Sequence, residues 1–224
     1  MIAAVVFDFD GVLANSEPLH FRAFREVAAR RGLTLTEPEY YNRYLGFDDV
    51  GAFRAMADDQ GAPLSSDDIT ALVAEKADVL EALEREGSVL FPGAREAIAR
   101  MASRGPIAIA SGAIKPEILR VLDREDLRRY FHVIVAAEDT PLSKPDPAPY
   151  RLAVEQLSAH VGVRLTPNEC VALEDSRWGL QSARGAGLRT IAITQSYDAA
   201  ALAADADIVI DTLDELTPAL LERL

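Results

Sequence analysis

The chain has 224 residues, of which 49% are hydrophobic and 26% charged, as is typical of a soluble globular protein with a sizeable core. Its formal net charge of −13 disfavours binding to nucleic acid or to an anionic membrane, because both need a basic surface. The single cysteine, Cys170, excludes an internal disulfide bond. No apolar stretch approaches a membrane span, and the opening run lacks the basic flank of a signal peptide, so we expect a cytoplasmic protein.

The first predicted element is an apolar, β-branched run that leads directly into Asp8, a pattern typical of a buried parallel strand. Asp8 and Asp10 stand at its C-terminal end, where open α/β sheets place their ligand crevice. Two carboxylates there are costly unless they bind a cation or act on a substrate. Taken by themselves, two aspartates so close together could instead form an acidic turn before a helix. Whether they belong to a functional site therefore depends on which residues follow the later strands.

A purely helical stretch comes next, beginning at Ser16-Glu17-Pro18 with a capping serine and an early proline. Its periodicity predicts helices from this start to Gly32 and over residues 38–45, 49–60 and 67–86. We interpret residues 15–88 as a helical cap domain. The remaining segments, 1–14 and 89–224, would form the core.

Strand and helix patterns alternate after residue 91, which predicts a parallel sheet covered by helices on both faces. Strands are expected over residues 106–110, 132–137, 170–173, 188–193 and, more weakly, 208–210. Helices are expected over residues 94–103, 116–122, 149–157 and 177–186 and at the C-terminus. The fold class is therefore α/β.

Polar residues follow the strands of this predicted sheet: Asp8 and Asp10 the first, Ser111 and Gly112 the second, Lys144 the third, and Glu174 and Asp175 the fourth. Because these strand ends converge on one crevice, we expect a single site. Carboxylates without histidine or cysteine suit Mg²⁺. A hydroxyl and backbone N–H groups opening a helix, with a lysine nearby, suit a phosphate group.

Each of these residues also has an ordinary explanation when it is taken alone. Ser111 could cap a helix, Lys144 could be a solvated loop lysine, and the segment 174–176 could cap the helix that follows it. Their coincidence at consecutive strand ends favours a site for a phosphorylated substrate.

Four segments carry a family resemblance: Asp8-Phe-Asp10-Gly-Val-Leu, Ala110-Ser111-Gly112, Ser143-Lys144-Pro145-Asp146-Pro147 and Leu173-Glu174-Asp175-Ser176. In order and spacing they resemble the motifs of the haloacid dehalogenase superfamily, specifically its phosphatase and β-phosphoglucomutase-like branch, over essentially the whole chain. The resemblance implies a Rossmann-like core with a helical cap. It also implies a Mg²⁺-dependent phosphatase that hydrolyses a sugar phosphate, a polyol phosphate or phosphoglycolate through an aspartyl-phosphate.

The resemblance also assigns roles to individual residues. It implies that Asp8 is the nucleophile and Asp10 the general acid and base. Mg²⁺ would be held by Asp8, the Asp10 carbonyl and Asp175, with Glu174 in or near the shell of ligands. Ser111, Gly112 and Lys144 would bind the phosphoryl group, and His20 and Lys76 in the cap match positions that contact the substrate or the hinge.

Some features depart from this family pattern or leave alternatives open. Asn15 stands where an acidic residue is common, and segment 46–49 is acidic where sugar phosphomutases carry an arginine for a second phosphate. We therefore expect hydrolysis, with a β-phosphoglucomutase-like mutase as the alternative. A haloacid dehalogenase without Mg²⁺ and a receiver-like signalling domain are less consistent with the motifs. His20 could instead be a partly buried helix histidine and Lys76 a solvated lysine. We expect a monomer or a weak homodimer.

Overall fold

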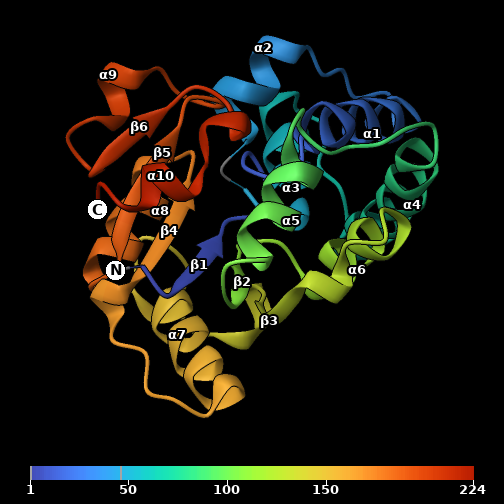
Figure 1. Cartoon of the computed structure of the whole chain (residues 1–224). Helices are drawn as coiled ribbons and strands as arrows, with labels where there is room; N and C mark the ends of the chain where they lie inside the picture. Colours follow the sequence, from blue (N-terminus) through green and yellow to red (C-terminus); the bar gives the residue numbers. More distant parts are fainter. Residues whose placement is uncertain (1, 46) are drawn as a thin grey trace. The chain divides into compact units, whose positions relative to one another are not determined.

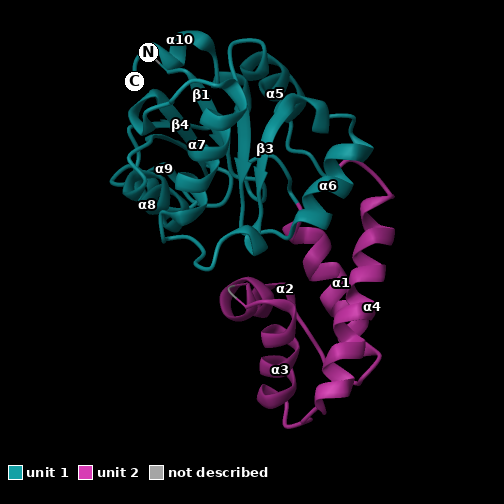
Figure 2. Cartoon of the chain, turned by 90° about the horizontal axis from the view of Figure 1, so that it is seen from below, with its two compact units in different colours: residues 1–15, 89–224 teal, residues 16–88 magenta. Residues whose placement is uncertain are grey.

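The computed structural model describes residues 2–45 and 47–224 (Figure 1). They divide into two compact units, which Figure 2 distinguishes by colour. Unit 1 combines residues 1–15 with residues 89–224, and unit 2 comprises residues 16–88. Gly46, part of the acidic segment named above, lies outside the described residues.

Unit 1 is built on one six-stranded sheet in the order β3-β2-β1-β4-β5-β6, and all five strand pairings are parallel. The strands are β1 (Ala4–Phe7), β2 (Ile107–Ala110), β3 (Phe131–Val135), β4 (Cys170–Glu174), β5 (Arg189–Ile193) and β6 (Ile208–Ile210). Strand β1 is central, and its Val5 pairs with Ile107 on one side and Val171 on the other. The expected parallel α/β fold is confirmed.

The sheet is buried on both faces. The main helices of unit 1 are α5 (Ala94–Ala102), α6 (Lys115–Arg124), α7 (Ala148–Val161), α8 (Arg177–Gly185), α9 (Ala199–Leu202) and α10 (Pro218–Leu221). Helix α7 packs on β2 and β3, and α8 packs on β4 and β5. Val6 joins the cluster under these helices, while its neighbour Phe7 points to the opposite face and is equally buried. The apolar strands therefore leave their polar residues at the strand ends.

Unit 2 is helical throughout. It contains α1 (Glu17–Ala29), α2 (Glu37–Glu39), a π-helical turn (Tyr40–Tyr44), α3 (Asp49–Asp59) and α4 (Ser66–Glu84). Ser65 and Asp68 form a reciprocal capping box that starts α4. Phe24, Phe53 and Leu72 lie in the apolar cluster that joins α1, α3 and α4. Unit 2 therefore has a hydrophobic core of its own.

Three local features differ from the sequence prediction. Ser16 occupies the N-cap position of α1, but its side chain makes no capping hydrogen bond there. The short helix α9 was not expected; Asp198 caps it through the N–H of Ala201. Asn15 belongs to unit 1 rather than to the helical segment, because its N–H donates to the carbonyl of Val89 at 2.7 Å.

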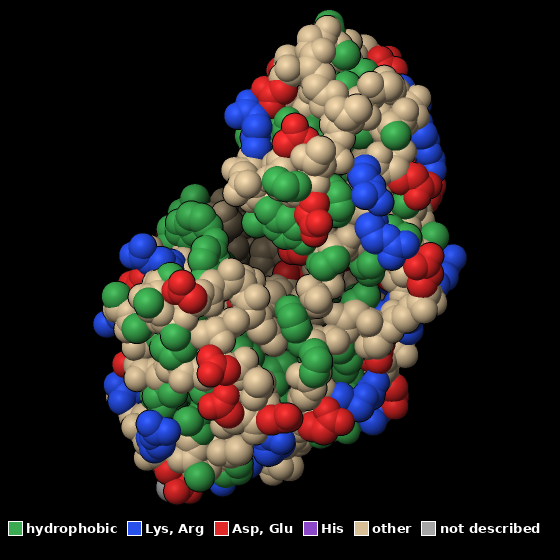
Figure 3. All heavy atoms as spheres, turned by 90° about the horizontal axis from the view of Figure 1, so that it is seen from above, with side chains coloured by type: hydrophobic (Ala, Val, Ile, Leu, Met, Phe, Trp, Pro, Cys, Tyr) green, Lys and Arg blue, Asp and Glu red, His purple; other side chains and the backbone are tan. Residues whose placement is uncertain are grey.

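Charged side chains of both signs are interspersed on the face of the molecule shown in Figure 3. Several arginines are paired with acidic neighbours, including Arg43 with Asp59 and Arg177 with Asp205. These pairs leave less uncompensated positive charge for a polyanionic partner. In the described part of the chain, every helix is too short or too polar to cross a lipid bilayer.

Candidate active site

The site in unit 1 is centred on Asp8, which follows the last residue of β1. Its backbone N–H still donates to the Leu173 carbonyl of β4, at 3.0 Å, so the sheet fixes the main chain at this point. The N–H of Phe9 donates to Asp8 Oδ1 at 2.7 Å. The Asp8 carboxylate is thus mostly buried and oriented by the backbone itself.

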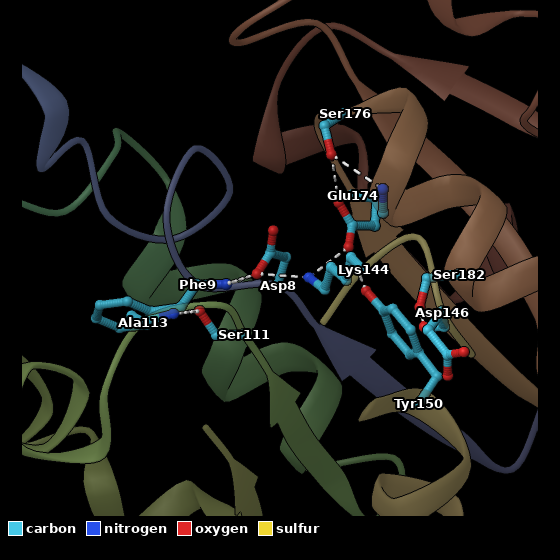
Figure 4. A network of polar contacts seen from close by, with 11 residues as sticks. Asp8, Phe9, Ser111, Ala113, Lys144, Asp146, Tyr150, Glu174, Ser176 and Ser182 are labelled. Atoms are coloured by element: carbon cyan, nitrogen blue, oxygen red, sulfur yellow. Dashed lines mark hydrogen bonds and ion pairs between the residues drawn. The ribbon is translucent and has the colours of Figure 1, made fainter. Parts of the chain in front are cut away.

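Lys144 joins two of the carboxylates. Its Nζ lies 2.9 Å from Asp8 Oδ1 and 2.6 Å from Glu174 Oε1 (Figure 4). Burial alone disfavours the Lys144 ammonium, but the charges of Asp8 and Glu174 outweigh that penalty and raise its pKa. Lys144 is therefore an ion-paired lysine beside Asp8 with a side chain only 12% exposed, not a solvated loop lysine.

Three carboxylates form a group that can hold a metal ion. One oxygen from each of Asp8, Glu174 and Asp175 lies within 4.8 Å of the others, and all three residues are buried. Burial, followed by repulsion from Asp8, raises the pKa of both Glu174 and Asp175. The arrangement fits a hard divalent cation such as Mg²⁺, because a cation relieves the mutual repulsion of the carboxylates. The side chain of Asp10 is not part of this group.

Two glycines make room for these carboxylates. A Cβ atom on Gly179, in the first turn of α8, would overlap the Glu174 carboxylate, and one on Gly11 would overlap the Asp175 carboxylate. Gly11 also has a φ of +75°, which L side chains rarely adopt. The main chain at these two glycines can therefore pack directly against the two carboxylates. The hydroxyl of Ser196 also donates to Asp175.

Ser111 and Gly112 follow β2 at the same edge of the sheet. Ser111 is buried, and its hydroxyl accepts the N–H of Ala113 at 3.0 Å. The helix expected after these residues is present as α6, which starts at Lys115. The alternative that Ser111 is a helix cap is wrong, because Ile114 occupies the N-cap position of α6. Ser111 instead closes a local turn, while Gly112 is exposed.

The cap residues His20 and Lys76 meet within unit 2. Lys76 is only 1% exposed, so the interpretation as a solvated lysine is wrong. Its Nζ lies 2.8 and 3.0 Å from the two carboxylate oxygens of Asp49 and 3.0 Å from His20 Nδ1, and it sits over the ring of Phe24. These three polar contacts use the donors of the ammonium.

Sequence reasoning missed several side chains of this site. In unit 1, Tyr150 on α7 donates to Glu174 and Ser196 donates to Asp175. Within unit 2, sequence reasoning also missed the pairing of Asp49 with Lys76. Tyr150 lies six residues after Lys144 and three residues beyond the end of its motif, and no pattern in the sequence indicates that Glu174 is its partner. Burial and the charge of Glu174 raise the pKa of Tyr150, which keeps its hydroxyl a donor.

A buried aspartate, a lysine and two further carboxylates at the strand ends of a parallel sheet define an α/β enzyme site for a charged substrate. The profile of the haloacid dehalogenase-like hydrolase family matches residues 2–187. The chain therefore belongs to that family, and it is a hydrolase.

Curated relatives are similar over most of the chain. The phosphorylated carbohydrates phosphatase of Thermotoga maritima is 34% identical over 190 residues, which cover 84% of this chain and 83% of the relative. The hexitol phosphatase B of Escherichia coli K12 is 32% identical, with 96% and 95% covered. The crystal structure of CbbY from Rhodobacter sphaeroides in complex with phosphate superposes with a TM-score of 0.83 at 32% identity, covering 99% of this chain and 100% of that one.

Proposed function

We propose that this protein is a Mg²⁺-dependent phosphatase that hydrolyses a small phosphorylated carbohydrate or polyol through an aspartyl-phosphate. The observation that carries the proposal is the contact of the buried Lys144 ammonium with Asp8 Oδ1 at 2.9 Å. That contact places a fixed positive charge beside the carboxylate that would attack. Figure 4 shows the second Asp8 oxygen pointing away from Lys144, which leaves an oxygen for in-line attack.

The proposed chemistry has two steps. In the first, an Asp8 oxygen bonds to phosphorus, the bond from phosphorus to the leaving oxygen breaks, and Asp10 gives its proton to that oxygen. In the second, Asp10 takes a proton from water as the water attacks the aspartyl-phosphate, which releases inorganic phosphate and restores Asp8. Lys144 and Ser111 would hold oxygens of the transferring group in both steps.

The metal would be held by carboxylates of Asp8, Asp175 and Glu174, and we assign the Asp10 carbonyl to the same shell of ligands. When bound, Mg²⁺ supplies positive charge that offsets the negative charge of the phosphate group. The site otherwise combines three carboxylates with the single ammonium of Lys144. This excess of negative charge would repel a phosphate without a cation.

We infer the substrate class from the polar residues of unit 2. We propose that His20 and Lys76 recognise the leaving group, and that the Asp49 carboxylate neutralises the Lys76 charge. A neutral Lys76–Asp49 pair is better suited to hydroxyl groups than to a second phosphate. A sugar or polyol monophosphate is therefore favoured over a bisphosphate, and hydrolysis over the phosphomutase alternative. The named activities of the carbohydrate and hexitol phosphatase relatives support this substrate class.

The test is a screen of sugar phosphates, polyol phosphates, phosphoglycolate and nucleotides, with and without Mg²⁺, that measures both released phosphate and isomerised sugar phosphate. We expect phosphate release that needs Mg²⁺ and falls by several orders of magnitude in Asp8→Asn, which keeps the size of the side chain but loses its charge. Isomerised product without phosphate release would establish a mutase instead. Near-normal hydrolysis by a folded Asp8→Asn variant would overturn the covalent mechanism.

A further inference from the structure

Tyr150, in the first turn of α7, lies directly against the Lys144–Glu174 pair. It is fully buried, and its hydroxyl donates to Glu174 Oε1 at 2.5 Å. The same oxygen accepts from Lys144 Nζ at 2.6 Å. The Lys144 ammonium in turn lies 5.2 Å from the centre of the Tyr150 ring. One side chain thus contacts both members of the pair, as Figure 4 shows.

The main chain that carries Lys144 is fixed independently of Tyr150. The Asp146 carbonyl accepts the hydroxyl of Ser182 on α8 at 2.5 Å, and Asp146 Oδ1 accepts the N–H of Ala148 at 2.8 Å. These bonds hold the loop, but the Lys144 side chain still has four carbon atoms between backbone and ammonium. The position of Nζ must therefore be set by the groups around it.

We propose that Tyr150 is a positioning residue that sets the place of the Lys144 ammonium between Glu174 and Asp8. The inference rests on the proposed phosphatase function, in which that ammonium binds the transferring phosphate. The Tyr150 hydroxyl donates a hydrogen bond to Glu174 Oε1, which also accepts from Lys144. Because this oxygen is shared, the Glu174 carboxylate attracts the ammonium less strongly, and Nζ stays in contact with Asp8. The π face of the Tyr150 ring lies against Nζ and stabilises its positive charge.

Tyr150→Phe removes the hydroxyl and keeps the ring. The ammonium should then move toward Glu174 and away from the phosphate position. We expect kcat/KM and the affinity for inorganic phosphate each to fall roughly 10-fold, the scale of one hydrogen bond to a charged group. Tyr150→Leu also removes the ring and should lose more than Tyr150→Phe.

The matched control is Tyr44→Phe in unit 2. Tyr44 is also a buried tyrosine whose hydroxyl donates to a carboxylate, that of Asp59, at 2.8 Å. This variant should lose similar thermal stability but keep its phosphate affinity and kcat/KM within about twofold, because the hydrogen bond that it loses lies within unit 2 and involves neither Lys144 nor its partners Asp8 and Glu174. The contrast separates positioning from simple loss of stability.

The measurements are kcat and KM at several Mg²⁺ concentrations, thermal unfolding, and calorimetric binding of inorganic phosphate to each folded variant in the presence of Mg²⁺. A Tyr150→Phe protein with unchanged phosphate affinity would overturn the inference. So would recovery of the wild-type rate at high Mg²⁺, which would place the effect at the metal. If the wild type hydrolyses no phosphate ester, the proposed function fails, and the calorimetric comparison still decides the role of Tyr150.

Discussion

The Lys76 ammonium and the Asp49 carboxylate form a two-pronged ion pair in unit 2, with Nζ 2.8 and 3.0 Å from the two carboxylate oxygens. The pair is asymmetric, because the Lys76 side chain is 1% exposed whereas 32% of the Asp49 side chain is exposed. Lys76 therefore depends on Asp49 and His20 for its hydrogen bonds, while Asp49 can still be solvated. The part of the pair that faces solvent within unit 2 is therefore the carboxylate.

The first prediction concerns Lys76→Met, which keeps the apolar stem and removes the charge. If Lys76 acts on the leaving group only, hydrolysis of a small aryl phosphate should remain within about twofold of wild type. Hydrolysis of the sugar or polyol phosphate should lose about 1–3 kcal/mol of transition-state binding, roughly 5- to 150-fold in kcat/KM. Lys115→Met is the control, since Lys115 pairs with Asp139 in the other unit. Equal losses on both substrates would remove Lys76 from the site.

The second prediction concerns Asp49→Asn, which keeps the shape of the side chain but leaves the Lys76 charge uncompensated. The ratio of kcat/KM for a sugar bisphosphate to that for the matching monophosphate should rise roughly 5- to 10-fold, because a free ammonium favours a second phosphate. Comparison of the two substrates within each protein cancels differences in active-enzyme content. An unchanged ratio would show that Asp49 does not select against a second anion.

The third prediction concerns the metal. Asp175→Ala removes one oxygen ligand and should raise the Mg²⁺ concentration that gives half-maximal activity, and Glu174→Ala should do so more mildly. The affinity of each variant for Mn²⁺, measured by electron paramagnetic resonance of the ion, does not depend on turnover. If both variants bind Mn²⁺ as the wild type does, the carboxylate group is not the metal site.

Much of the fold could be predicted because the strands of unit 1 are short, apolar and bounded by clear turn residues. The weak strand over residues 208–210 coincides with β6 (Ile208–Ile210), and Ser176 caps α8 through the N–H of Gly179. These features are local, since each depends on a few neighbouring residues. Helix α9 could not be predicted in this way, because four residues are too few to show the spacing of apolar residues that indicates a helix.

The contacts between side chains distant in the chain could not be predicted. Tyr150 and Glu174 are 24 residues apart, and Lys76 and Asp49 are 27 apart, so no short-range pattern links them. The sequence placed Asp49 in an acidic loop, but only packing against α4 turns that acid into the partner of a buried lysine. The role of Gly179 was hidden for the same reason, because it depends on the position of the Glu174 carboxylate.

The last prediction uses Glu17, at the start of α1, whose Oε2 accepts the hydroxyl of Tyr40 at 2.7 Å. Burial raises the pKa of Glu17 above 4.5, against the lowering effects of the Tyr40 hydrogen bond and of Lys76. Glu17 therefore ionises in the unfolded chain at a lower pH than in the folded one. As the pH rises above about 4.5, its ionisation favours the unfolded state, and the cost is complete above the folded-state pKa.

Glu17→Gln removes this cost and can still accept the Tyr40 hydroxyl. The difference in Tm between Glu17→Gln and wild type should be more positive at pH 7.5 than at about pH 4, where both carry a neutral side chain. Glu75→Gln should show the opposite sign, because hydrogen bonds from Arg30 and the charge of Arg31 lower the pKa of Glu75. Its ion pairs contribute stability above the unfolded-state pKa and lose it as the pH falls. Thermal unfolding of the three proteins at both pH values measures the two differences, and equal signs would contradict the assigned environment of Glu17.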